Sequence, residues 1–299
     1  MSVALQQRRI RPGELREDEP MAAYTTWRVG GRARRLYCPK GAEDLASFLA
    51  ALPVQEAVLW CGLGSNLLVR DGGVAGTVVL TQGALDGLSI DGHRVRAEAG
   101  VACGRLARAT VREGLDGLCF LAGIPGTVGG ALALNAGAWG GETWERVVAV
   151  ETIDRAGRIR VREPAAFEVG YRRVQAPGEE RFLAATWELP RAQVEVLRER
   201  VRALLRRRNA TQPVGQPTCG SVFRNPPGAA AGQLIDRAGL KGVRLGGARV
   251  SSRHANFILN EGGRAADIEA LIEHVRQRVV AVHGVRLELE VHVVGEGGS

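Results

Sequence analysis

The chain has 299 residues, of which 45% are hydrophobic, so it is long enough to form two domains with their own cores. It has five cysteines without a CxxC pair and no uninterrupted apolar run that could cross a bilayer. These features exclude a disulfide framework, a structural zinc site and membrane insertion. The N-terminal stretch also lacks the apolar segment of a secretion signal, so we expect a cytoplasmic protein. We also expect no bound metal and a monomer.

The first part of the chain alternates short strands with glycine-rich turns. Pro53 ends a predicted helix, and the turn Asp154–Gly157 forms the tip of a predicted hairpin. Apolar runs between the turns predict the remaining elements of this part. They are helices over 43–52 and 105–114, strands over 57–61, 67–70, 77–80 and 94–100, and the hairpin over 146–163.

The second part begins with an arginine-rich helix over residues 191–208. Its apolar residues recur at helical spacing, which places most of the arginines on a solvated face. A helix over 229–237, strands near 243–250 and 256–259, a helix over 265–283 and a final strand over 287–295 follow. We therefore divide the chain into an N-terminal extension (1–20), a first domain (21–190) and a second domain (191–299).

The net charge of +8 raises the question of a nucleic-acid partner. All but Lys40 and Lys241 of the 40 basic residues are arginines, and the densest run spans 198–208. No aromatic residue lies within that run, so it lacks the stacking platform of a single-strand binder. We expect the charge to attract anionic small molecules and expect no nucleic-acid partner. A basic nucleic-acid-binding protein, whose glycine loops are only turns, remains the alternative from another functional class.

Two glycine loops carry most of the functional information. The first, CGLGSNLLVRDGG, starts at Cys61, and the second, CFLAGIPGTVGGALALNAGAWGG, covers 119–141. Gly62 and Gly64 do not open a helix as a Rossmann fingerprint would, and no lysine follows either cluster as in a P-loop. One such loop alone is most often a tight turn. Two of them, with small polar residues among the glycines, favour a strand-loop-strand cradle for a diphosphate.

Six motifs, in order along the chain, resemble the UDP-N-acetylenolpyruvoylglucosamine reductase family, from about Tyr24 to Gly295. The motifs are YTTWRVGG, GLGSNLLVRDGG, GIPGTVGGALALNAGAWG, GYRRV, CGSVFRNP and KGVRLGGARVSSRHANFILN. The resemblance implies an α+β fold, with an FAD-binding domain of the vanillyl-alcohol-oxidase type and a smaller α+β substrate domain. It also implies that the last strand, about 285–295, returns to the active site.

The resemblance implies non-covalent FAD, NADPH as the electron donor and reduction of UDP-N-acetylglucosamine enolpyruvate to UDP-N-acetylmuramate for peptidoglycan. The cofactor-binding residues that it implies lie in the two loops. They are Gly62, Leu63, Gly64, Ser65, Asn66, Leu67, Gly123, Ile124, Pro125, Gly126, Thr127, Gly129, Gly130, Asn135 and Gly137.

Reducing an enol ether attached to a carboxylate requires a hydride, a proton and stabilisation of the charge that develops on the carboxylate. The resemblance assigns the carboxylate to Arg172 and the proton to Ser221, and adds Glu290 as the third catalytic residue. Arg173 is the neighbour most easily confused with Arg172, and in an extended segment the two would point to opposite faces. Candidate substrate-binding residues are Tyr171, Arg224, Asn225 and Asn256.

The chain departs from the longer members of the family, because the residues from Val174 run into the next strand without an inserted tyrosine loop. We therefore assign it to the shorter type, in which the group that covers the substrate stays open. A flavin oxidase on the same cofactor-binding fold is the nearer alternative. Such oxidases often tether the flavin through His or Cys, and the first loop offers only Cys61.

Overall fold

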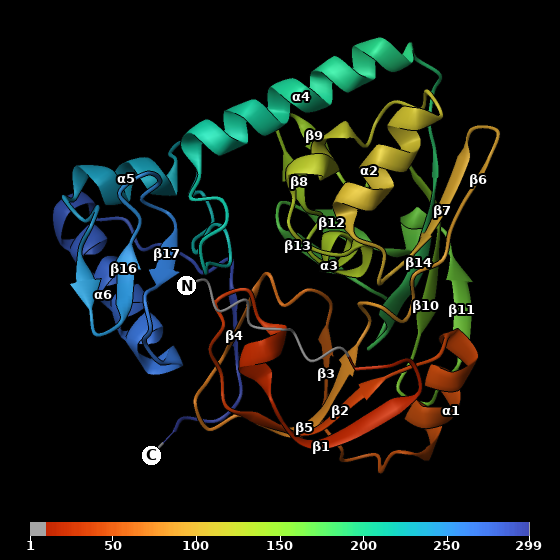
Figure 1. The fold of residues 1–299 in the computed structure, drawn as a ribbon, viewed down its shortest axis with the longest axis horizontal. Coiled ribbons are helices and arrows are strands. Elements are labelled where there is room, and N and C mark those ends of the chain that lie inside the picture. Colours follow the sequence, from red (N-terminus) through yellow and green to blue (C-terminus); the bar gives the residue numbers. More distant parts are fainter. Residues whose placement is uncertain (1–9, 299) are drawn as a thin grey trace, which may run out of the picture.

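The computed structural model describes residues 10–298, and two sheets form the larger part of it (Figure 1). The first sheet has the order β1-β2-β5-β3, with β1 antiparallel to β2 and the other pairs parallel. Residues 14–20, expected to belong to an N-terminal extension, form β1 at the edge of this sheet. The rest of the expected extension up to residue 9 lies outside the described residues. The elements are β1 (Glu14–Pro20), β2 (Arg32–Cys38), α1 (Ala42–Ala51), β3 (Val58–Cys61) and β5 (Val74–Leu80).

The second sheet is antiparallel throughout, in the order β11-β10-β14-β7-β6. Helices α2 and α3 share its core, and α1 packs between the two sheets through Leu45 and Leu49. The elements are β6 (Leu88–Asp91), β7 (Arg94–Glu98), α2 (Cys103–Arg112), η2 (Cys119–Gly123), α3 (Val128–Ala133), β10 (Val147–Ile153), β11 (Ile159–Arg162), η3 (Pro164–Ala166) and β14 (Arg181–Glu188). The predicted hairpin is therefore confirmed as β10 and β11.

The C-terminal part is a small three-stranded sheet, β15-β16-β17, packed against α5 and α6. The strand predicted near 243–250 is in fact two, because Gly246 adopts a φ of 53° and turns the chain back. Helix α4 runs from this part across to α2 and η2 (Figure 1), where Leu197 is buried. The elements are α4 (Val194–Thr211), α5 (Ala231–Arg237), β15 (Arg244–Leu245), β16 (Ala248–Val250), β17 (Ile258–Asn260) and α6 (Ala265–His283).

Several contacts fasten the C-terminal part to the residues around the first sheet. Trp27 is fully buried in the C-terminal core, and its indole N–H donates to the carbonyl of Ile258 at 2.8 Å. The chain end returns as β18 (His292–Val294), which pairs in parallel with β4 (Leu67–Val69) directly after the first glycine loop. The last segment of the chain is thus held beside that loop.

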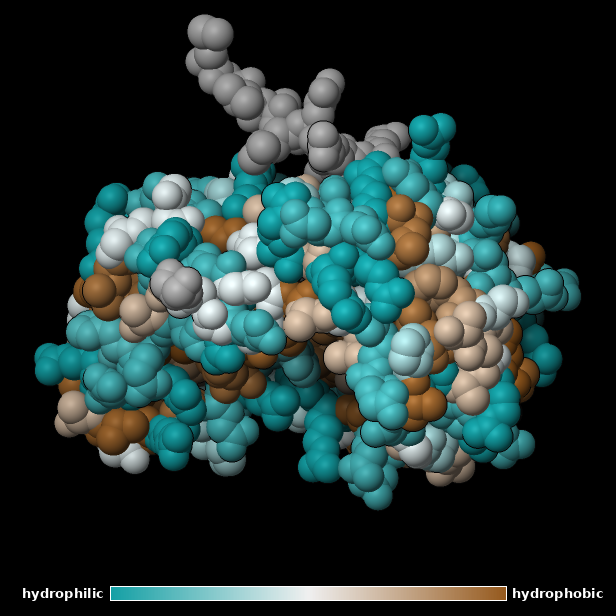
Figure 2. All heavy atoms as spheres, turned by 90° about the horizontal axis from the view of Figure 1, so that it is seen from below, coloured by the Kyte–Doolittle hydropathy of each residue, from teal (hydrophilic) through white to brown (hydrophobic). Residues whose placement is uncertain are grey.

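No helix among residues 10–298 is long and apolar enough to cross a membrane. Figure 2 shows one face of the molecule, on which hydrophilic residues predominate and hydrophobic ones are scattered.

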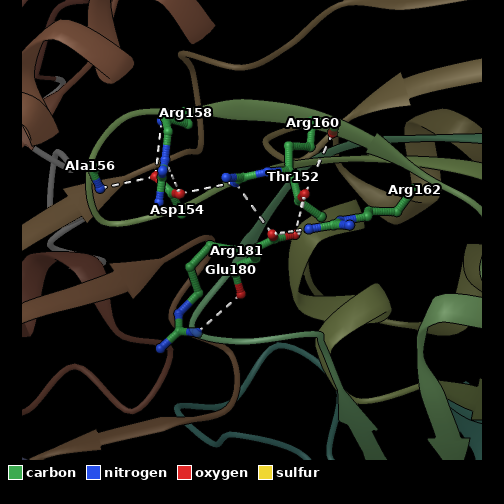
Figure 3. A network of polar contacts seen from close by, with 8 residues as sticks. All are labelled: Thr152, Asp154, Ala156, Arg158, Arg160, Arg162, Glu180 and Arg181. Atoms are coloured by element: carbon green, nitrogen blue, oxygen red, sulfur yellow. Dashed lines mark hydrogen bonds and ion pairs between the residues drawn. The ribbon is translucent and has the colours of Figure 1, made fainter.

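A buried carboxylate directly before β14 joins this strand to β10 and β11 (Figure 3). Glu180 is 6% exposed and accepts hydrogen bonds from Thr152 at 2.6 Å and from Arg162 at 2.5 Å. Arg160 bridges this carboxylate and Asp154. The hydrogen bond from Arg162 holds the pKa of Glu180 below its usual value.

We expect Glu180→Gln to destabilise the protein by about 2 kcal/mol at pH 7, because a neutral amide pairs less well with two guanidinium groups that keep partial solvent access. A lowered folded pKa stabilises the protein above the unfolded pKa, and that stability is lost as pH falls through the folded value. Thermal unfolding at pH 7 and pH 3 should therefore show a gap that closes at low pH. The exposed neighbour Glu179→Gln is the control, and a gap of equal size at both pH values would contradict the account.

Candidate active site

The two glycine loops lie against each other. The first (62–66) joins β3 to β4, and the second (123–127) joins η2 to α3. A Cβ added at Gly62 would collide with the Thr127 hydroxyl, and one added at Gly126 would lie 3.2 Å from Ser65 Oγ. Glycine is therefore needed where the loops meet, and together the loops form one cradle of backbone and small hydroxyl groups.

Free amides line this cradle. Within the described part of the chain, the N–H groups of Ser65 and Asn66 donate no hydrogen bond to protein. Gly64 adopts a φ of 63° and presses on the backbone of Tyr24, so a side chain there is strained. Successive free amides that follow a glycine turn fit a diphosphate, so the residues present suit a dinucleotide cofactor.

The remaining residues predicted to bind the cofactor divide into two groups. Gly123 and Gly129 face protein, since a Cβ at Gly123 would collide with Trp139 and a Cβ at Gly129 would collide with Ala99. Asn135 is buried and uses its side chain inside the protein. The others stay in or beside the two loops, namely Leu63, Leu67, Ile124, Pro125, Gly130 and Gly137.

Arg172 projects from a two-residue loop between β12 (Glu168–Gly170) and β13 (Arg173–Gln175). Its φ is 54°, a conformation that favours glycine or asparagine, and such strain in a non-glycine residue is typical of functional sites. The expectation of an extended Arg172–Arg173 segment was wrong. Arg173 is nevertheless directed elsewhere, because it is exposed and donates to the Gln175 side chain at 3.0 Å.

The Arg172 guanidinium is held on three sides. Nε donates to Glu290 Oε1 at 3.1 Å, Nη1 to the carbonyl of Asn135 at 3.3 Å and Nη2 to the carbonyl of Gly137 at 2.7 Å. Two of these acceptors belong to the segment after α3, which follows the second glycine loop. The third, Glu290, is tied to the first loop, so Arg172 lies near the cradle.

Glu290 reaches the same place from the chain end. Its backbone carbonyl accepts from Asn66 Nδ2 at 3.0 Å, which ties it to the first loop. Burial raises the pKa of the Glu290 carboxyl despite the opposing charge of Arg172. The predicted strand over 287–295 was wrong before residue 292, because the N–H groups of Glu290 and Val291 both donate to the carbonyl of Val222.

The same contact brings Ser221 to the site. Glu290 donates its N–H to the carbonyl of Val222 at 2.8 Å, so Ser221 directly precedes a residue paired with Glu290. Ser221 is half-buried and follows Gly220, whose φ of 84° turns the chain. Asn256 fixes the far side of this segment by exchanging two hydrogen bonds with the backbone of Phe223. The three predicted catalytic residues thus come from segments that meet at one place.

The four predicted substrate-binding residues differ in how free they are. Tyr171 is 48% exposed, and the Arg172 Cζ lies 4.9 Å from its ring centroid. Arg224 Nη1 is 3.9 Å from Glu288 Oε2. The buried Nε of Arg224 has no hydrogen-bond partner within the described chain. Asn225 is exposed and caps α5 through Ala231, whereas the Asn256 side chain is fully used on Phe223.

Glu142 is a residue that the sequence analysis did not single out. Its Oε2 accepts from Asn135 Nδ2 at 2.8 Å, beside the loop that binds Arg172. It follows a glycine pair in a segment without periodicity, so no local pattern marks it.

Replacing Glu290 tests the balance between burial and the ion pair. The pKa of Glu290 is higher in the folded than in the unfolded protein, so its ionisation lowers the free energy of unfolding. This loss begins as the pH rises above the unfolded pKa and is complete above the folded pKa. We therefore expect Glu290→Gln to unfold at a higher temperature than the wild type at pH 8 and at the same temperature at pH 4, where the carboxyl is already largely neutral. Thermal unfolding at the two pH values measures this, and a variant less stable than wild type at pH 8 would show that the ion pair with Arg172 dominates.

Two protein families match the two parts of the chain. Residues 33–162 match the FAD binding domain family, and residues 212–294 match a family described as UDP-N-acetylenolpyruvoylglucosamine reductase, C-terminal domain. Together with the glycine cradle, these matches define an FAD-dependent oxidoreductase with an α+β fold. They confirm the fold class and the flavin cofactor expected from the sequence.

Full-length relatives give the family. The chain is 62% identical over 294 residues to a UDP-N-acetylenolpyruvoylglucosamine reductase of Alkalilimnicola ehrlichii, covering 98% of this chain and 99% of the relative. It is 55% identical to one of Methylococcus capsulatus, covering 95% and 94%. The crystal structure of the Thermus caldophilus reductase matches with a TM-score of 0.82 at 35% identity, covering 95% of this chain and 99% of that one. The chain belongs to the UDP-N-acetylenolpyruvoylglucosamine reductase family.

Proposed function

We propose that this enzyme uses NADPH to reduce UDP-N-acetylglucosamine enolpyruvate to UDP-N-acetylmuramate, a cytoplasmic step in peptidoglycan synthesis. The observation that carries the proposal is the meeting of Arg172, Glu290 and the Ser221 segment beside the glycine cradle. FAD bound in that cradle supplies two-electron chemistry, since it accepts hydride from one substrate and gives it to the other.

Arg172 is suited to hold the substrate carboxylate. A guanidinium has five N–H donors, and the contacts to Glu290 and two carbonyls use three of them. One N–H remains on each of Nη1 and Nη2, which is the pair that a carboxylate accepts in bidentate fashion. Because Arg172 is already held, it needs little reorganisation when negative charge builds on the carboxylate during reduction.

Ser221 gives the proton in this proposal. Its segment is fixed to Glu290 on one side and to Asn256 on the other, which supports the assignment because Glu290 also pairs with Arg172. A serine hydroxyl is a weak acid, but the vinyl carbon that is left carbanion-like after hydride addition is a much stronger base. Glu290 orients Arg172, and burial raises the pKa of its carboxyl above the usual value. In this proposal, Asn135 and Asn256 act as positioning residues, because their side chains are used inside the protein.

The cysteines disfavour the oxidase alternative. Cys61, the residue of the first loop that could tether a flavin, is 1% exposed, and burial raises the pKa of its thiol to about 12. Such a thiol forms little thiolate and is a poor nucleophile. This supports non-covalent FAD.

We also propose that residues 21–190 bind FAD and that 191–299 hold the nucleotide-sugar. The half-buried Arg224 side chain belongs to the second region and lies near the carboxylates of Glu288 and Glu290. No inserted loop covers the site from β13, since five residues (176–180) join it to β14. The ring of exposed Tyr171 lies 4.9 Å from Arg172 Cζ and would border the substrate there.

Product analysis tests the proposal. Purified holoenzyme, NADPH and UDP-N-acetylglucosamine enolpyruvate should yield a product that is heavier by two hydrogens, with one NADPH consumed per product under anaerobic conditions. NADPH consumption that requires oxygen and leaves the enol ether unchanged would reject it in favour of an oxidase.

A further inference from the structure

Asn135 links three segments around the site through its side chain. It is 2% exposed and adopts a φ of 41°. Its Nδ2 donates to Glu142 Oε2 at 2.8 Å and to the carbonyl of Gly170 at 3.4 Å, while its Oδ1 accepts from the N–H of Trp144 at 3.2 Å. The end of α3, the short hairpin of β8 (Gly137–Ala138) and β9 (Gly141–Glu142), and the end of β12 are therefore joined at one amide.

These three segments are the ones that hold Arg172. The carbonyls of Asn135 and Gly137 accept two of its hydrogen bonds, and Gly170 directly precedes the loop that carries it. A Cβ added at Gly137 would lie 3.0 Å from Glu142 Cγ and 3.4 Å from Arg172 Nη1. Glu142 thus lies across Gly137 from the guanidinium, and no hydrogen bond or ion pair joins the two side chains in the described chain.

We propose that Glu142, acting through Asn135, is a positioning residue that fixes the guanidinium of Arg172. This inference rests on the proposed function, in which Arg172 binds the substrate carboxylate. Glu142 is half-buried, and its hydrogen bond to the Asn135 amide is charge-assisted, so it is stronger than a neutral pair.

The backbone explains why such a clamp is needed. Asn135 and Arg172 both have positive φ, and strained residues persist only where their surroundings over-determine them. Without Glu142, Asn135 Nδ2 keeps only the long contact to Gly170, so the two carbonyls that accept from Arg172 are held less firmly. A displacement of about 1 Å at a catalytic group can slow a reaction about 100-fold.

The test compares Glu142→Ala with Glu142→Gln, which keeps an acceptor for Asn135. Glu168→Ala, an exposed carboxylate on the same hairpin as Arg172, is the matched control. Each holoenzyme is reduced with NADPH under anaerobic conditions and mixed rapidly with substrate. We expect Glu142→Ala to slow reoxidation about 30-fold and to leave reduction by NADPH within about twofold. Glu142→Gln should stay within about threefold of wild type, and Glu168→Ala should be unchanged.

A second readout follows Arg172 itself. In ¹⁵N–¹H spectra, the Nε–H signal that disappears in Arg172→Lys should be sharp in the wild type and in Glu142→Gln, and broadened in Glu142→Ala. If Glu142→Ala does not fold, Asn135→Asp serves instead. This variant places two carboxylates against each other and should slow reoxidation. Adding Glu142→Gln to it restores a hydrogen-bond donor and should recover most of the rate.

Several outcomes would overturn the inference. The inference fails if Glu142→Ala is reoxidised at the wild-type rate, or if both of its half-reactions slow equally. It also fails if Glu142→Gln is as slow as Glu142→Ala, or if Asn135→Asp combined with Glu142→Gln shows no recovery. Failure of the proposed function is distinguishable, because the wild type itself would then not be reoxidised by the substrate. The Arg172 signal still reports on the clamp in that case.

Discussion

Replacing Ser221 with alanine is expected to slow reoxidation of the reduced enzyme by substrate about 1,000-fold and to leave its reduction by NADPH within about twofold. The reason is that the hydroxyl is needed only when the carbon takes up a proton, and reduction of the flavin by NADPH includes no such step. Rapid mixing under anaerobic conditions, with each half-reaction followed separately, measures both rates.

Ser252→Ala is the control, because this exposed serine lies in the same C-terminal part but away from the Glu290 contact. An equal loss of both half-reactions in Ser221→Ala would indicate that Ser221 supports the cofactor or the fold. Unchanged reoxidation would show that another group delivers the proton.

Replacing Arg172 with lysine should lower the rate of reoxidation by about 100- to 1,000-fold, although the positive charge is kept. An ammonium has three donors, so it cannot keep the contacts to Glu290 and two carbonyls and also bind a carboxylate through two parallel hydrogen bonds. Reduction by NADPH should change little. Single-turnover rates at saturating substrate measure the loss.

Arg173→Lys is a close control, since it makes the same change one residue away on an exposed side chain. It should reoxidise at the wild-type rate. Equal losses at the two positions would mean that the overall positive charge of the hairpin matters, and the specific geometry of Arg172 does not.

Elements with strong local signals were predicted well. Helix α6 spans Ala265–His283 as expected, because Ile268, Leu271 and Val275 recur at helical spacing and Gly284 ends the helix with a φ of 67°. The β10–β11 hairpin was equally clear, since an Asp-Arg-Ala-Gly turn separates two alternating runs.

Elements set by distant contacts were not predictable from local pattern. The alternation over 287–291 indicated a strand, yet Glu290 and Val291 share a single acceptor, Val222, about seventy residues earlier in the chain. Arg172 was expected in an extended segment, because nothing in the neighbouring residues reports its positive φ. Both errors fall at the site, where tertiary contacts override local preference.

The candidate site shows the same division. The glycine loops could be identified from composition, because close backbone approach requires glycine. Their mutual contact, the three anchors of Arg172 and the proposed role of Glu142 depend on residues that come from different elements. The catalytic assignments rest on the resemblance and stay proposals, and local sequence provided no independent reason for them.

The most direct test of the central claim is an anaerobic titration of the purified holoenzyme with NADPH, followed by addition of UDP-N-acetylglucosamine enolpyruvate, with the visible flavin absorption recorded throughout. The account predicts that NADPH bleaches the flavin and that the enol ether restores its colour in proportion to the amount added. A flavin that stays bleached with the enol ether and recovers only when oxygen is admitted would contradict it.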